Sequence, residues 1–75
     1  MNDDLRAAIL DMALRRGRAR SFCPSEVARA LAADWRRLMP EIRAVAAAMP
    51  EIRATQRGAE VDPVTARGPI RLQLR

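Results

Sequence analysis

The stretch MPEIRATQRG, residues 49–58, is where the chain changes from helical to extended periodicity. Before Met49 the apolar residues recur at intervals of three and four, as on one side of a helix. After Pro50 they alternate, so that Ile52 and Ala54 share one face and arginines fall on the other. A proline disfavours the helical region for the residue before it. The sequence therefore predicts helices up to this point and strands after it.

The same alternation returns at the C-terminus, where Ile70, Leu72 and Leu74 are separated by polar residues. Between the two extended segments, residues 58–69 contain the Gly, Asp and Pro residues that favour turns. We expect the two segments to pair as a hairpin with a long loop. An isolated hairpin is marginal in water, so its apolar face should pack on the first and third helices.

The first helix is predicted to begin at Asn2 or Asp3 and to end at Gly17. Acidic residues fall in its first turn and arginines in its last, as the helix dipole favours. Its apolar stripe comprises Leu5, Ala8, Ile9 and Met12.

The second helix is predicted over residues 24–33, after a short extended connector at Ser21-Phe22. It starts with a proline at the first helical position, and Cys23 and Glu26 imitate a capping box. Its apolar stripe comprises Val27, Ala28 and Leu31.

The third helix is predicted from Pro40 to about Met49, after a turn at Asp34 and a helical turn over residues 35–39. Three helices, the last two joined by a tight turn, followed by a hairpin, are the element order of a winged helix-turn-helix domain. We therefore predict one α+β domain over residues 1–75, with three helices and a C-terminal two-stranded β-hairpin wing.

The composition argues against several classes of function. Among the 75 residues there is no histidine or tyrosine and only one cysteine, so Ser/His or Cys/His nucleophile pairs and Cys/His zinc sites cannot be assembled. We expect no enzyme activity, no cofactor and no metal. The lone thiol, Cys23, is either a partly buried helix cap or a redox-sensitive group. Without a long apolar run we expect a cytoplasmic protein that does not enter a membrane.

The net charge of +5 comes from 14 arginines and no lysine. Guanidinium groups are permanently charged and make bidentate contacts to phosphate, so double-stranded DNA is the first partner to consider. The outward side of the third helix carries Glu41 and three alanines beside Arg43, which offers little to read base edges. The hairpin and the turn before the third helix are the better candidates. The predicted nucleic-acid-binding residues are Arg36, Arg37, Arg43, Arg53, Arg57, Arg67 and Arg71.

Other interpretations of these residues remain open. Charged side chains on an outer strand face also prevent edge-to-edge association. The domain could instead be a protein-protein interaction or scaffold module, or a homodimer, with no role in nucleic-acid binding. Arg29 is predicted to pair with Glu26 at i, i+3, and Phe22 and Trp35 are predicted to anchor the core.

Four ordered blocks of the chain resemble the bacterial domain-of-unknown-function family 3253. The third helix departs from the family pattern, because it stops at Met49-Pro50 where the family continues to a glycine turn. The resemblance implies a winged-helix-like fold and implies nothing about activity. The blocks are CPSEVAR at 23–29, WR at 35–36 with LMP at 38–40, QRG at 56–58 with VDP at 61–63, and RGPIR at 67–71.

Overall fold

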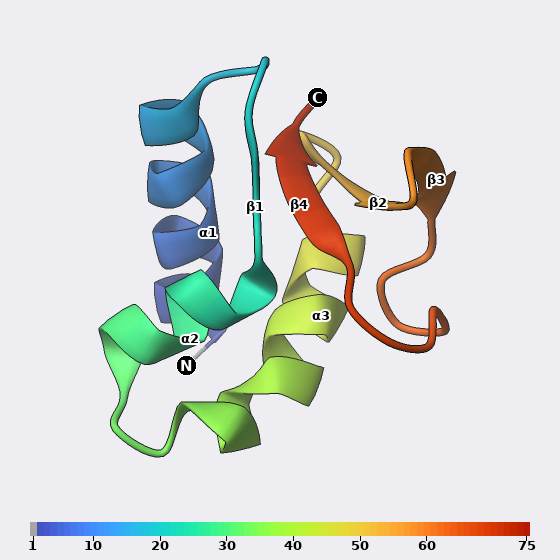
Figure 1. Ribbon diagram of the computed structural model, residues 1–75. Coiled ribbons are helices and arrows are strands. Elements are labelled where there is room, and N and C mark those ends of the chain that lie inside the picture. The colour runs from blue at the N-terminus through green and yellow to red at the C-terminus, as the bar shows by residue number, and fades with distance from the viewer. Residues whose placement is uncertain (1) are drawn as a thin grey trace.

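Three α-helices, a short 3-10 helix and a four-stranded antiparallel sheet make up the computed structural model, which describes residues 2–75 (Figure 1). The helices lie on one side of the sheet, so the molecule is a mixed α+β domain with two layers. The elements in chain order are α1 (Asn2–Arg16), β1 (Ser21–Phe22), α2 (Pro24–Leu31), η1 (Trp35–Leu38), α3 (Met39–Ala47), β2 (Ile52–Gln56), β3 (Ala59–Val61) and β4 (Arg71–Leu74).

The C-terminal strand β4 lies inside the sheet, whose order is β1-β4-β2-β3. It pairs with β2 in a register that sets Ile52 opposite Leu74 and Ala54 opposite Leu72. This confirms the predicted pairing of the two extended segments. Apolar residues thus face one another across the strands, as the alternating pattern requires.

The sheet has four strands, so the prediction of a two-stranded hairpin is wrong in the number of strands. Arg57 and Gly58 both have positive φ angles, 54° and 84°, as in a two-residue type I′ turn. This turn folds β3 back onto β2 inside what was predicted to be a long loop. The predicted connector Ser21-Phe22 is the other additional strand, β1, because it pairs with β4.

The core is built from side chains of every helix and of the sheet. Phe22 is fully buried, which confirms its predicted role. Trp35 is partly buried and packs against the core, so it contributes to the core as predicted. Leu31 is 43% exposed, so the prediction that it is buried is wrong. The reason at Leu31 is that α2 ends there, two residues earlier than predicted, with Ala32 in an extended conformation. The buried hydrophobic residues are Leu5, Ile9, Ala13, Phe22, Val27, Ala28, Ile42, Ala46, Met49, Ile52, Ala54, Ile70 and Leu72.

None of the helices within residues 2–75 has both the length and the apolar character needed to cross a bilayer.

A carboxylate at the start of α2 ties this helix to α1. Glu26 accepts a hydrogen bond of 2.9 Å from the Cys23 backbone N–H and one of 2.6 Å from the Arg16 guanidinium. The Arg16 hydrogen bond, followed by the one from Cys23, lowers the pKa of Glu26 below its ordinary value of 4.5. Glu26 therefore pairs with Arg16 and not, as predicted, with Arg29.

We expect Glu26→Gln to lower the free energy of unfolding at neutral pH by about 1 kcal/mol, because it removes an ion pair and weakens a helix cap. The carboxylate has a lowered pKa in the folded state. Its contribution is therefore present above pH 4.5 and is lost as the pH falls through the folded-state value. Urea unfolding of both proteins should show a difference that shrinks below pH 4.5. A difference that is constant with pH, or one equally large for the exposed control Glu41→Gln, would contradict this role.

Candidate nucleic-acid interface

Only some of the arginines form ion pairs with acidic residues. Within residues 2–75, five of the fourteen arginines pair with five of the nine acidic residues, which leaves nine arginines and four acids without such a pair. The location of these unpaired groups decides which surface attracts a polyanion. The five pairs are Arg6–Glu51, Arg15–Asp11, Arg16–Glu26, Arg37–Asp34 and Arg75–Glu60.

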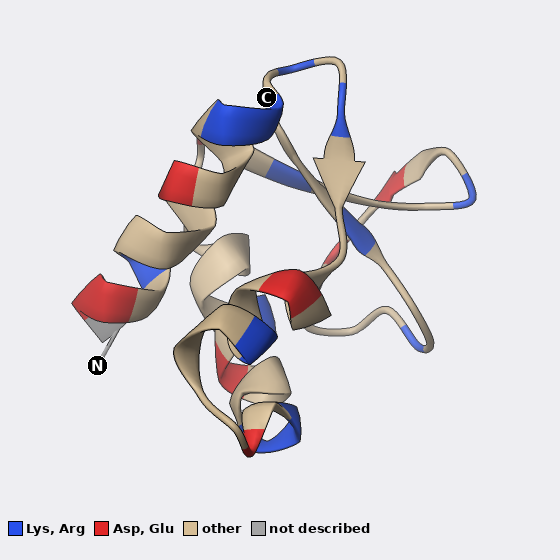
Figure 2. Ribbon diagram, turned by 60° about the vertical axis from the view of Figure 1, so that its left-hand side comes forward, with Lys and Arg blue, Asp and Glu red and all other residues tan. Residues whose placement is uncertain are grey.

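Two of the unpaired acids lie beside the exposed side of α3. Asp3 and Glu41 line a groove between α1 and α3, together with Ala44, Ala48 and Arg6, whose charge is paired with Glu51. Figure 2 shows the acidic first turn of α1 next to the N-terminus, whereas basic positions mark the loops that join the strands. A phosphate backbone would be repelled at the α3 groove, and its alanines donate no side-chain hydrogen bonds.

Arg53 and Arg71 project from the face of the sheet that the helices leave open. The register sets Arg53 opposite Gln73 and Arg71 opposite Thr55, on two neighbouring strands. The Arg53 guanidinium donates to Gln73 Oε1 at 3.2 Å. The structure therefore brings these two predicted residues together on one face.

The Arg71 guanidinium is oriented by the edge strand β1. It donates from Nε to the Ser21 hydroxyl and from Nη2 to the Ser21 carbonyl, each at 3.0 Å. Both acceptors are neutral, so the guanidinium charge stays available to an anion. Its remaining N–H groups can still donate to a phosphate.

Arg57 and Arg67 occupy the turn and the loop that extend from this sheet. Both are exposed, and neither side chain makes a hydrogen bond or ion pair with another described residue. Gln56 holds the loop in place, because its Nε2 donates to the carbonyls of Arg67 at 2.6 Å and Pro69 at 3.1 Å. Arg67 is thus displayed on a loop that is anchored to β2, and Arg57 on the turn that follows this strand.

Arg43, another of the predicted residues, is engaged by the chain itself. Its guanidinium donates to the carbonyls of Pro63 at 3.4 Å, Ala66 at 2.8 Å and Gly68 at 2.7 Å. These three bonds fasten the loop between β3 and β4 to α3. We therefore treat Arg43 as a residue that positions the loop and leave it out of the candidate interface.

Arg36 and Arg37 lie on η1, which packs against α2 and α3. Arg37 pairs with Asp34 at 3.1 Å, and Arg36 stacks over the Trp35 ring. Arg29 stacks over the same ring, an arrangement that the sequence prediction missed. The one hint in the sequence is that Arg29 lies on the exposed side of α2, one turn after Glu26.

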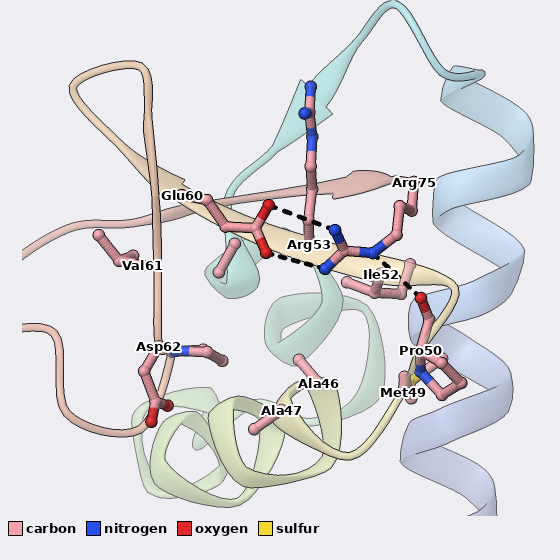
Figure 3. A pocket seen from close by; sticks show the side chains of 12 residues that line it. Ala46, Ala47, Met49, Pro50, Ile52, Arg53, Glu60, Val61, Asp62 and Arg75 are labelled. Atoms are coloured by element: carbon pink, nitrogen blue, oxygen red, sulfur yellow. Dashed lines mark hydrogen bonds and ion pairs between the residues drawn. The ribbon is translucent and has the colours of Figure 1, made fainter.

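A groove of about 470 Å³ lies between α3 and the β2-β3 edge of the sheet (Figure 3). Across it Arg75 makes a bidentate ion pair with Glu60, at 3.2 and 3.0 Å, and donates from Nε to the Pro50 carbonyl. This hydrogen bonding lowers the pKa of Glu60 and raises that of Arg75. Arg53 points away from the pair in Figure 3. Arg75 and Glu60 satisfy each other, so this pair adds no free cation to the interface, although Arg53 and Asp62, unpaired among the described residues, also line the groove.

The fold and the surface together define a small α+β domain with a basic open sheet face. Residues 2–75 match the model of a family described as protein of unknown function (DUF3253), so the chain belongs to this family. The match confirms the resemblance of the four sequence blocks. A comparison with curated proteins finds no match.

We expect Arg43→Ala to lower the free energy of unfolding by about 2 kcal/mol, because it leaves three carbonyls of the loop without their charged donor. Hydrogen exchange should quicken at the amides of residues 64–68. Arg43→Lys should recover only part of the loss, since an ammonium cannot reach three carbonyls as a planar guanidinium does. Exchange rates unchanged from wild type, or equal to those of Arg15→Ala, would rule out the anchoring role.

Proposed function

We propose that this domain binds double-stranded nucleic acid weakly and mainly by electrostatic contacts, through arginines of the open sheet face and its loops. The observation that carries the proposal is the placement of four arginines without acidic partners on this part of the described chain. They are Arg53, Arg57, Arg67 and Arg71.

We also propose that the fold is a winged helix-turn-helix. In support, η1 and a short turn connect α2 and α3, and the last strand β4 lies between β1 and β2. In this interpretation residues 57–70 form the wing, with β3 as an addition near its base. A basic wing suits contacts to phosphates or to the minor groove, which give affinity without reading the base sequence.

The surface of α3 favours binding of this non-specific kind. The groove beside α3 carries Asp3 and Glu41. The one arginine of the helix itself, Arg43, is occupied by loop carbonyls. A recognition helix would need donors and acceptors directed at base edges. The sheet face and wing are therefore the proposed points of contact.

An alternative is a protein-interaction module in which the exposed alanines of α3 contact a partner or a second copy of the chain. The groove lined by Ala44, Val45 and Ala48 favours this alternative. Such a complex would depend little on salt, whereas binding through phosphate contacts weakens steeply as salt rises.

We expect a labelled mixed-sequence duplex to bind with a dissociation constant on the order of micromolar at about 50 mM salt, and to be largely released at about 200 mM. The variant Arg57→Asn/Arg67→Ala should weaken binding about tenfold or more and lower the salt slope by about 2, because two phosphate contacts are lost. Asparagine suits the positive φ of position 57 and the glycine that follows it, so the turn is preserved. Fluorescence anisotropy gives both quantities.

The matched control is Arg6→Ala/Arg15→Ala, which removes the same charge from two ion-paired arginines of α1. Both double variants change the net charge from +5 to +3. Equal losses in the two variants would show that only total charge matters. The absence of wild-type binding at low salt would overturn the proposed function and favour the protein-interaction alternative.

A further inference from the structure

Trp35 packs against the core and also holds two guanidinium groups at one corner of the molecule. The Cζ atoms of Arg29 and Arg36 lie 4.5 and 4.4 Å from the centroid of the Trp35 ring. Both arginines are exposed, and the tryptophan is half-buried. We propose that Arg29, Trp35 and Arg36, here named the Trp35 cluster, form a second phosphate-binding point for a nucleic-acid backbone. The inference rests on the proposed function and extends it to another surface.

The cluster keeps two like charges close together. Because both groups lie over one ring, their Cζ atoms are no more than about 9 Å apart. Attraction to the negative face of the indole offsets the repulsion between them. Among the described residues neither guanidinium donates a hydrogen bond to a protein acceptor, so their N–H groups remain free to donate.

The acidic groups nearest in sequence are already engaged. Asp34 accepts from Arg37 at 3.1 Å, and Glu26 accepts from Arg16 at 2.6 Å. Among the described residues, neither Arg29 nor Arg36 forms an ion pair. An anion from outside the domain is therefore the natural partner of these free N–H groups.

Stacking also prepares the two arginines for binding. A free arginine side chain loses rotamer freedom when it is fixed on a ligand, and this loss weakens binding. The indole already holds both guanidinium groups over its ring. A planar guanidinium of fixed orientation matches the two oxygens of a phosphate, which an ammonium group does not.

The Trp35 cluster and Arg71 lie toward opposite ends of α2. The Arg71 side chain is bonded to Ser21, three residues before α2 begins, and its charge contributes to the lowered pKa of Glu26 in the first turn. Arg29 and Trp35 lie at and beyond the other end of the helix. The eight residues of α2 span about 12 Å, which is comparable with the width of the major groove. Cationic points toward the two ends of this helix can therefore contact different phosphates of one duplex.

The test uses the intrinsic fluorescence of Trp35, the sole tryptophan in a chain without tyrosine, together with anisotropy of a labelled mixed-sequence duplex. Duplex binding should change the Trp35 emission of the wild-type protein. Arg29→Ala and Arg36→Ala should each weaken duplex binding about fivefold at low salt and reduce the salt slope by about 1. The matched control is Arg15→Ala, which removes one exposed arginine of α1 and should weaken binding by no more than about twofold.

Substitutions of Trp35 show whether its ring positions the two arginines or only fills space. Trp35→Phe keeps a smaller π face and should retain part of the affinity, whereas Trp35→Leu should bind as weakly as the arginine variants. Circular dichroism and thermal unfolding verify that each variant is folded. If Trp35→Leu is folded and binds the duplex as tightly as wild type, the positioning role of the ring is overturned.

The remaining outcomes distinguish this inference from the function on which it rests. If wild type binds duplex and the Arg57→Asn/Arg67→Ala variant is impaired, but Arg29→Ala and Arg36→Ala behave like Arg15→Ala, the inference fails and the proposed function stands. If wild type binds no duplex, both fail. A polyglutamate peptide that changes Trp35 emission at lower charge concentration than the duplex does would assign the cluster to an acidic protein and overturn the proposal.

Discussion

The pairing of β4 with two strands at once is the constraint on which the rest of the structure depends. This strand closes the sheet between β1, which follows the first helix, and β2, which follows the third. Leu72 is fully buried, and the adjoining Ile70 is nearly so, which fixes both the register of β4 and its face. Because the two partners of β4 come from distant parts of the chain, β4 joins the segment after α1 and the segment after α3 in one sheet. The chain between β2 and β4 first adds β3 to the edge of the sheet and then returns to β4 through a loop that is held at both ends.

Electrostatics divide the surface that this fold creates. The α1 and α3 side keeps Asp3 and Glu41, and the α1 arginines Arg6, Arg15 and Arg16 are all paired with acids. The open sheet face, its loops and the end of α2 carry arginines that have only neutral partners or none within the described chain. The uneven distribution of paired and unpaired arginines, more than the net charge, directs the proposed interface away from α3.

The sequence predicted those features that depend on local periodicity. The three helices, the glycine at the end of α1 and the pairing of β2 with β4 all follow from spacing that is visible in the chain. Strands β1 and β3 were missed because two or three residues are too few to show an alternation. The turn at Arg57-Gly58 gave a weak signal, since arginine is an uncommon residue at positive φ.

Side-chain partners were the least predictable level of the structure. Glu26 had two arginines within reach of its helix end, and only the packing of α1 against α2 selects Arg16 over Arg29. Arg43 was taken for a surface cation because the loop whose carbonyls it binds lies more than 20 residues away in the sequence. Trp35 was assigned to the core on its residue type alone, which cannot reveal the two arginines that cover it.

The most direct test of the account is nuclear magnetic resonance of the arginine side-chain Nε–H groups during titration with a short mixed-sequence duplex. Each of the 14 arginines contributes one such signal, so the surface in contact is mapped without altering the protein. The account predicts salt-sensitive shifts at Arg53, Arg57, Arg67 and Arg71, and at Arg29 and Arg36, with Arg6 and Arg15 unchanged. Shifts confined to α1 and Arg43, or equal shifts at all positions, would contradict it.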